Sequence, residues 1–245
     1  MASSYLDVVI SILPPDCSTI LHSTFFGEND EDVAQGLAVA PNGDIVIAGD
    51  GRIPPTPGAF DSTYSGNTDG FVARFDPQLT TLKYSGAYSS GGFDHCWDVA
   101  VDAAGCALVM GEVGSASGFP VTPDAFYSTL QGGLDCGFLK IDPTGTQVLF
   151  GTFFGGTFHD QGYLVGETET GGVLVGGITY SADFPTTDGA YDEIPAGLWA
   201  LDGFVASFDL CGGSFQEYGA SCPSANGAHL AASGCAAPGR TIGLS

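Results

Sequence analysis

An aspartate recurs at one position of a repeated ten-residue stretch, which makes it the first candidate for chemistry. The stretch is written three times: STFFGENDED at 23–32, SGAYSSGGFD at 85–94 and GTFFGGTFHD at 151–160. The equivalent aspartates are Asp32, Asp94 and Asp160. Carboxylates from adjacent loops, completed by Asp30 and backbone carbonyls, are the hard oxygen ligands that Ca²⁺ prefers, so we predict a calcium site here. The alternative is structural: each carboxylate accepts hydrogen bonds from nearby backbone N–H groups and fixes a turn.

Two histidines follow the same pattern, because His95 and His159 each lie next to one of these aspartates. An Asp–His pair could act as an acid and base or hold a transition metal. The first repeat has Glu31 in place of a histidine, however, and adjacent residues of a strand point to opposite faces. No GxSxG, HExxH or phosphate-binding glycine motif accompanies them. We expect no catalytic residues, which makes an enzyme the less favoured hypothesis.

The repeat that positions these residues predicts an all-β fold. Equivalent aspartates are separated by 62 residues and then by 66. Within one repeat, strands at 33–40 and 45–49 flank an Asn-Gly turn, and strands at 70–75 and 81–88 flank an Asp-Pro turn. A recurring unit of four short antiparallel strands is typical of a β-propeller blade, with the first strand innermost.

The same residues resemble a known family, the SBBP-type bacterial β-propeller repeat. The matching segments are STFFG, LAVAPNGDIVIAGD and PTPGAFDSTYSGNTDGFVARFDP, together with their later copies. The resemblance covers about 7–210, and it implies a propeller at the bacterial cell surface or outside the cell. The family offers no catalytic residues to carry over to this chain.

The repeats also suggest how the chain is divided. We expect propeller repeats over 1–219, with a partial blade at 1–32 and full repeats at 33–94, 95–160 and 161–219. Residues 220–245 are expected to form a Cys/Gly/Ala-rich tail or a truncated C-terminal module. This division gives about three and a half blades, an open arc or a part of a larger ring, because closed propellers typically have at least four.

Charge and composition narrow the partners. The net charge is −23, because there are only five basic residues against 28 acidic ones. This composition argues against binding nucleic acid, which needs Lys and Arg to replace counterions. No apolar segment is long enough to insert into a membrane, and the chain begins without a signal-peptide pattern. Protein or glycan ligands remain open, as does self-association through open blade edges.

The seven cysteines lack any CxxC spacing, so a zinc ribbon or a thioredoxin-like site is not expected. We predict a disulfide between Cys222 and Cys235 in an oxidising compartment, since they lie close together in a Gly-rich tail. Cys96 and Cys106 should stay unpaired, because they fall at opposite ends of one hairpin.

Two functions of different classes therefore stay open. The first is a non-enzymatic, extracellular propeller scaffold for interaction or adhesion, stabilised by Ca²⁺. The alternative is a carbohydrate-binding or carbohydrate-hydrolysing propeller that uses carboxylates at the channel mouth. For the alternative, rings that could stack on sugars are provided by Trp97, Trp199, Tyr64, Tyr127, Tyr180 and Tyr191.

Overall fold

The computed structural model describes residues 6–28, 31–169, 171–194, 201–210 and 229–230, which fold into strands and connections. The strands are β1 (Val8–Ile12), β2 (His22–Phe26), β3 (Val33–Val39), β4 (Ile45–Asp50), β5 (Gly70–Phe75), β6 (Leu82–Tyr88), β7 (Asp94–Val101), β8 (Ala107–Val113), β9 (Asp135–Ile141), β10 (Val148–Phe154), β11 (Asp160–Glu167), β12 (Val173–Thr179), β13 (Asp202–Asp209) and β14 (His229–Leu230). Over these residues, the prediction of an all-β fold is confirmed. They include no helix long and apolar enough to span a membrane.

The strands form one two-stranded sheet, β1–β2, and three four-stranded sheets. Each of the four-stranded sheets is an antiparallel meander: β3-β4-β5-β6, β7-β8-β9-β10 and β11-β12-β13-β14. The Asn-Gly turn behaves as predicted, since Gly43 has a φ of 85° and its N–H bonds to the carbonyl of Ala40. The last strand differs: β14 comes after the predicted repeat boundary at 219 and pairs only with Phe208 and Asp209.

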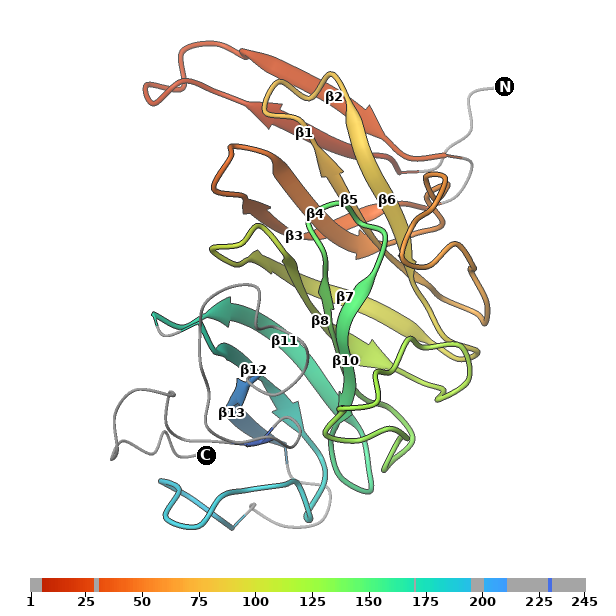
Figure 1. The fold of residues 1–245 in the computed structure, drawn as a ribbon, viewed down its shortest axis with the longest axis vertical. Coiled ribbons are helices and arrows are strands. Elements are labelled where there is room, and N and C mark those ends of the chain that lie inside the picture. The colour runs from red at the N-terminus through yellow and green to blue at the C-terminus, as the bar shows by residue number, and fades with distance from the viewer. Residues whose placement is uncertain (1–5, 29–30, 170, 195–200, 211–228, 231–245) are drawn as a thin grey trace.

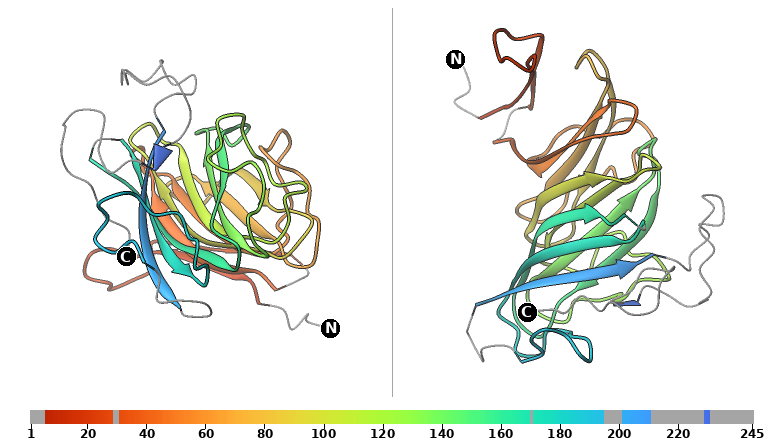
Figure 2. Two further views of the ribbon diagram at one scale, coloured as in Figure 1. Left: turned by 90° about the horizontal axis from the view of Figure 1, so that it is seen from below. Right: turned by 90° about the vertical axis from the view of Figure 1, so that its left-hand side faces the viewer.

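The sheets follow one another along the longest axis of the molecule, with β1 and β2 at one end and β11 to β13 at the other (Figure 1). The first strand of each four-stranded sheet lies beside the first strand of the next, so β3, β7 and β11 form one row. The right-hand view of Figure 2 shows successive sheets at successive levels. This row brings equivalent residues of different repeats close together.

Three apolar cores fill the spaces between neighbouring sheets. Val8 and Ile10 of β1 pack with Ile47 and Phe71 of the next sheet, as one face of each strand turns inward. The second core lies between the sheets that begin with β3 and β7, and the third lies between those that begin with β7 and β11. Each inner sheet is therefore apolar on both faces, and burial between sheets is the main stabilising contribution.

The outer strands are covered by the long connection between the second and third strands of their own sheet. Thr56 N–H donates to the carbonyl of Ser85 in β6 at 2.9 Å, and Thr122 N–H donates to the carbonyl of Gly151 in β10 at 3.0 Å. The threonine hydroxyls accept from the Ser85 and Gly151 N–H groups, both at 3.1 Å. The recurring TPGAF and TPDAF motifs therefore protect strand edges that would otherwise be open.

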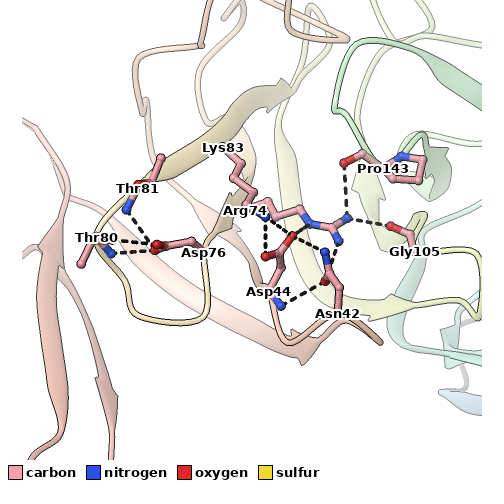
Figure 3. A network of polar contacts seen from close by, with 9 residues as sticks. All are labelled: Asn42, Asp44, Arg74, Asp76, Thr80, Thr81, Lys83, Gly105 and Pro143. Atoms are coloured by element: carbon pink, nitrogen blue, oxygen red, sulfur yellow. Dashed lines mark hydrogen bonds and ion pairs between the residues drawn. The ribbon is translucent and has the colours of Figure 1, made fainter.

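A buried arginine, Arg74, forms an ion pair within its own sheet and hydrogen bonds to the next sheet (Figure 3). Arg74 Nε lies 2.9 Å from Asp44 Oδ2, and Lys83 Nζ contacts the same carboxylate at 2.6 Å. The Arg74 guanidinium also donates to the carbonyl of Gly105 at 2.7 Å and to that of Pro143 at 3.4 Å, both in turns of the following sheet. One side chain thus satisfies a carboxylate in its own sheet and two carbonyls in the next.

The two aromatic residues of the repeated stretch do not pack in the same way in every copy. Phe153 and Phe154 are completely buried, and Phe26 packs edge-on against Phe75 with ring centroids 5.0 Å apart. The side chain of Phe25 is 76% exposed. The reason is that Phe25 lies on the outer face of the β1–β2 sheet, which no other sheet covers among the described residues.

The cysteine predictions are confirmed where the structure can test them. Cys96 and Cys106 are both buried and free, and Cys96 pairs across the hairpin with Gly111. Cys222 and Cys235, the predicted disulfide, lie outside the described residues.

Candidate functional site

The three equivalent aspartates lie where the sequence places them, at or just before the first strand of each four-stranded sheet. Their side chains are buried and turn back into the preceding connection. In each copy one carboxylate oxygen accepts the N–H of the residue four positions earlier: Asp32 from Glu28 at 2.8 Å, Asp94 from Ser90 at 2.5 Å and Asp160 from Gly156 at 2.7 Å. These contacts favour the turn-fixing alternative.

A second aspartate approaches each of these turns from the start of a third strand. Asp135 accepts from the Gln131 N–H at 2.5 Å, and Asp69 accepts from the Ser89 hydroxyl at 2.6 Å. A Cβ atom on Gly155 would lie 2.6 Å from Asp160 Oδ2 and 3.0 Å from Asp135 Oδ1. Two carboxylates thus crowd against the backbone of Gly155, which favours glycine here, whereas the second copy has Ser89 at this position, with its hydroxyl bonded to Asp69.

Burial changes the protonation of these groups. Burial raises the pKa of Asp94 and that of Asp135 to about 6, although backbone N–H donors oppose the shift. The pKa of Asp160 is raised by burial as well, with a smaller contribution from the charge of Asp183. Asp94 and Asp135 therefore ionise close to neutral pH, at the cost of holding a charge away from water.

The predicted calcium ligands are thus divided among separate turns. Asp32, Asp94 and Asp160 each accept hydrogen bonds from the connection just before them, Asp94 also accepts from the Gly114 N–H, and Asp160 also accepts from the Ser181 hydroxyl. Asp30 lies outside the described residues. In the part of the chain that the structure describes, no three His, Cys, Asp or Glu side chains lie together as metal ligands. Calcium binding remains a prediction from the sequence.

A different set of side chains is brought together along the row of first strands. Each first strand contains a one-residue irregularity in its pairing at an equivalent position, which is Gln35 in β3, Trp97 in β7 and Tyr163 in β11. A bulge of this kind re-aims the extra side chain and is frequent next to functional sites. Its recurrence in three repeats places Trp97 and Tyr163 in contact across two sheets, with ring centroids 5.3 Å apart.

We call the group around these rings the first-strand cluster. Its members are Asp50, His95, Trp97, Glu112, Gln161 and Tyr163. Asp50 comes from one sheet, three of the residues come from the second, and Gln161 and Tyr163 come from the third. The cluster therefore spans all three four-stranded sheets.

The polar contacts of the cluster form a chain. His95 Nδ1 lies 3.1 Å from Asp50 Oδ2, and His95 Nε2 lies 3.9 Å from Glu112 Oε1. Glu112 Oε2 accepts a hydrogen bond from the Gln161 amide, whose oxygen accepts from the Tyr163 hydroxyl at 2.7 Å. The imidazole also stacks on Trp97 at a centroid distance of 5.3 Å. Carboxylates on both sides of one imidazole are the arrangement expected for a histidine held as a cation.

The electrostatics agree with this assignment. The interaction with Asp50 raises the pKa of His95, with further contributions from the charges of Glu112 and Asp94, while burial opposes them. An imidazole whose two nitrogens both face carboxylates is less available as a general base. The neighbouring thiol cannot serve as a nucleophile, because burial raises the pKa of Cys96 well above its usual range. The geometry thus suits ligand binding better than bond cleavage.

Sequence reasoning identified part of this cluster. His95 and Trp97 were candidates, but Asp50, Glu112 and Tyr163 were not connected with them. A usable signal was present, because Asp50 and Glu112 are 62 residues apart and lie at or next to the last residue of the second strand in successive sheets. His159, by contrast, is exposed and lies beside Gly133 without joining the cluster.

The aromatic residues predicted to stack on sugars lie elsewhere. Tyr64 donates its hydroxyl hydrogen bond to the carbonyl of Ile53 at 2.6 Å, and Tyr127 packs against Phe126 with ring centroids 4.5 Å apart. Tyr191 is largely exposed, whereas Trp199 lies outside the described residues. Of the predicted rings, Trp97 alone is placed within the first-strand cluster.

Comparison with known proteins adds no family to this description. No protein-family model matches the chain, and no curated protein matches it.

Proposed function

We propose that this chain is a non-enzymatic scaffold for interaction or adhesion, built from about three and a half propeller-type blades and displayed outside the cell. The first-strand cluster carries the proposal. It gathers charged, amide and aromatic side chains from three sheets in one place, while its histidine is held between two carboxylates. Such a group of side chains offers hydrogen bonds and ring faces to a partner.

The arrangement of the sheets supports the propeller part of the proposal. Four-stranded meanders packed face to face, with their first strands in a row, are what neighbouring blades of a propeller look like. The extracellular setting rests on the resemblance to the SBBP-type repeats.

A carbohydrate ligand is the second candidate, and Trp97 and Tyr163 favour it. Aromatic rings beside carboxylate and amide groups can stack on a sugar ring and bind its hydroxyls. The two carboxylates of a hydrolase would in this case be Asp50 and Glu112, since Asp94 and Asp160 are bound to their own turns.

The test uses the folded protein on a glycan array, together with a hydrolysis assay on the same glycans. A scaffold that binds proteins should be inactive in both assays. A glycan-binding module should bind a glycan without cleaving it, and Trp97→Phe should weaken that binding. Turnover that is lost in Glu112→Gln, with folding intact, would contradict the non-enzymatic proposal.

A further inference from the structure

The β1–β2 sheet is half of a sheet that the other repeats complete. Residues Asp7–Phe26 align without a gap on Asp69–Tyr88, so β1 is equivalent to β5 and, one repeat further on, to β9. β5 pairs with a strand on each side, and so does β9. Within the described residues, β1 pairs with β2 alone. Half of the backbone N–H and C=O groups of β1 therefore point away from the sheet, along an open edge.

An apolar patch lies next to that edge, on the first strand of the following sheet. The side chains of Leu37 and Val39 in β3 are 58% and 64% exposed. Val99, the residue of β7 equivalent to Leu37, is only 3% exposed. The difference has a structural cause. Val99 packs in a core with Val46, which lies in the second strand of the sheet before it. The sheet before Leu37 is the β1–β2 sheet, which has no equivalent of that second strand among the described residues.

We propose that the edge of β1 together with Leu37 and Val39 forms a docking site, the open-edge site, for a β-hairpin of a partner polypeptide. The hairpin would take the place of a first and second strand, so it should be extended, with apolar residues at alternate positions. It should also be neutral or basic, because this chain carries a net charge of −23. The inference deepens the proposed scaffold function by naming the kind of partner.

The commitment to a hairpin follows from interfaces that the chain already contains. In the next sheet, the hairpin β3–β4 pairs with β5 through six residue pairs, from Ile45 with Phe75 to Asp50 with Gly70. Val8 and Ile10 of β1 already pack on this sheet in the manner of a complete blade. A docked hairpin would continue the same pairing and the same core by one more unit.

The chain itself supplies the probe. A fluorescent peptide of residues 33–50 carries the β3–β4 hairpin. It should contain Asp44→Asn, because β1 has Ile12 at the position of Arg74, and Asp50→Asn, so that its side chains are neutral like those of the proposed partner. The binding partner is the full chain, and the readout is fluorescence anisotropy. Leu37→Asp tests the site, and Leu164→Asp is the matched control, since Leu164 is equally exposed at 65% but lies in β11, in the last sheet.

We expect saturable binding of this peptide and none of a scrambled one. Leu37→Asp should weaken binding at least about tenfold, because a carboxylate would have to leave water, whereas Leu164→Asp should not change it. Lack of saturable binding, or equal weakening in both variants, would overturn the proposal. A dimer of the chain alone that is dissociated by Leu37→Asp would also overturn the proposal, because the occupant of the site would then be a second copy of the chain. The assay involves neither glycan nor turnover, so its failure leaves the scaffold proposal in place.

Discussion

Replacing Arg74 by alanine should cost far more stability than replacing Arg52, although both arginines pair with an aspartate at 2.9 Å. The Arg74 side chain is 4% exposed and its partner Asp44 is 2% exposed, whereas the Arg52 side chain is 47% exposed. Arg74→Ala also leaves the carbonyl of Gly105 without its guanidinium donor. The two variants remove the same charge, so the comparison isolates burial.

The expected magnitude follows from what remains after the change. Breaking a buried ion pair costs about 3–5 kcal/mol, and the loss in Arg74→Ala should fall near about 3 kcal/mol because Lys83 still neutralises Asp44. Arg52 is half exposed although its partner Asp69 is buried, and Asp69 keeps the hydrogen bond from Ser89, so this pair should contribute only about 1 kcal/mol. With an m-value of about 3 kcal/mol per molar urea, the first change moves the unfolding midpoint by roughly 1 M and the second by little.

The pH dependence adds an independent check. Burial acts to raise the pKa of Asp44, but the hydrogen bonds from Lys83 and Asn42 and the charge of Arg74 lower it overall. A lowered folded-state pKa gives stability that is present above the unfolded pKa and is lost as the pH falls through the folded one. The difference in free energy of unfolding between wild type and Arg74→Ala should therefore become smaller below about pH 4. Equal urea midpoints for Arg74→Ala and Arg52→Ala at pH 7 would refute this account of the buried pair.

Three further predictions concern the turns and the strand edges. The folded-state pKa values of Asp94 and Asp135 are raised to about 6, so the stability that their neutral forms contribute is lost as the pH rises through 6. Urea unfolding should therefore show a larger free energy of unfolding at pH 5 than at pH 7. This difference between the two pH values should be smaller in Asp94→Asn and in Asp135→Asn. If the aspartates only fix turns, millimolar Ca²⁺ should raise the melting temperature no more than NaCl of equal ionic strength; an extra rise that Asp160→Asn abolishes would instead support the predicted cation site. Thr122→Val should cost about 1–2 kcal/mol in urea unfolding, because the Gly151 N–H loses its acceptor at a covered edge, and an unchanged midpoint would contradict the edge-covering role.

Local features of the fold could be predicted because local residues determine them. The turn at Asn42 and Gly43 and the strands on either side follow from turn chemistry and alternating polarity, and the structure places them within one or two residues. The position of the aspartates beside the first strand of each sheet was also predicted to within a residue, because each carboxylate accepts a hydrogen bond from the connection just before it.

Other features depend on contacts between distant segments, which composition and alternation do not show. The exposure of Phe25 depends on whether another sheet lies on its face, while Phe153 in an equivalent position is buried. The first-strand cluster depends on a bulge at Trp97, which shifts the alternation by one residue and brings the ring to Tyr163. The pairing of His95 with Asp50 joins two sheets, so neither strand alone reveals it.

In the row of repeated sheets, the first sheet is half complete over the described residues, and one edge of β1 is unpaired. Amide hydrogen exchange resolved to single residues can detect this unpaired edge by comparing β1 with its equivalents β5 and β9. The account predicts that exchange is slow at every amide within β5 and β9, whereas in β1 fast and slow amides alternate, because only those directed at β2 are bonded. Slow exchange at all amides of β1, as in β5, would show that its second edge is already paired and would contradict the claim.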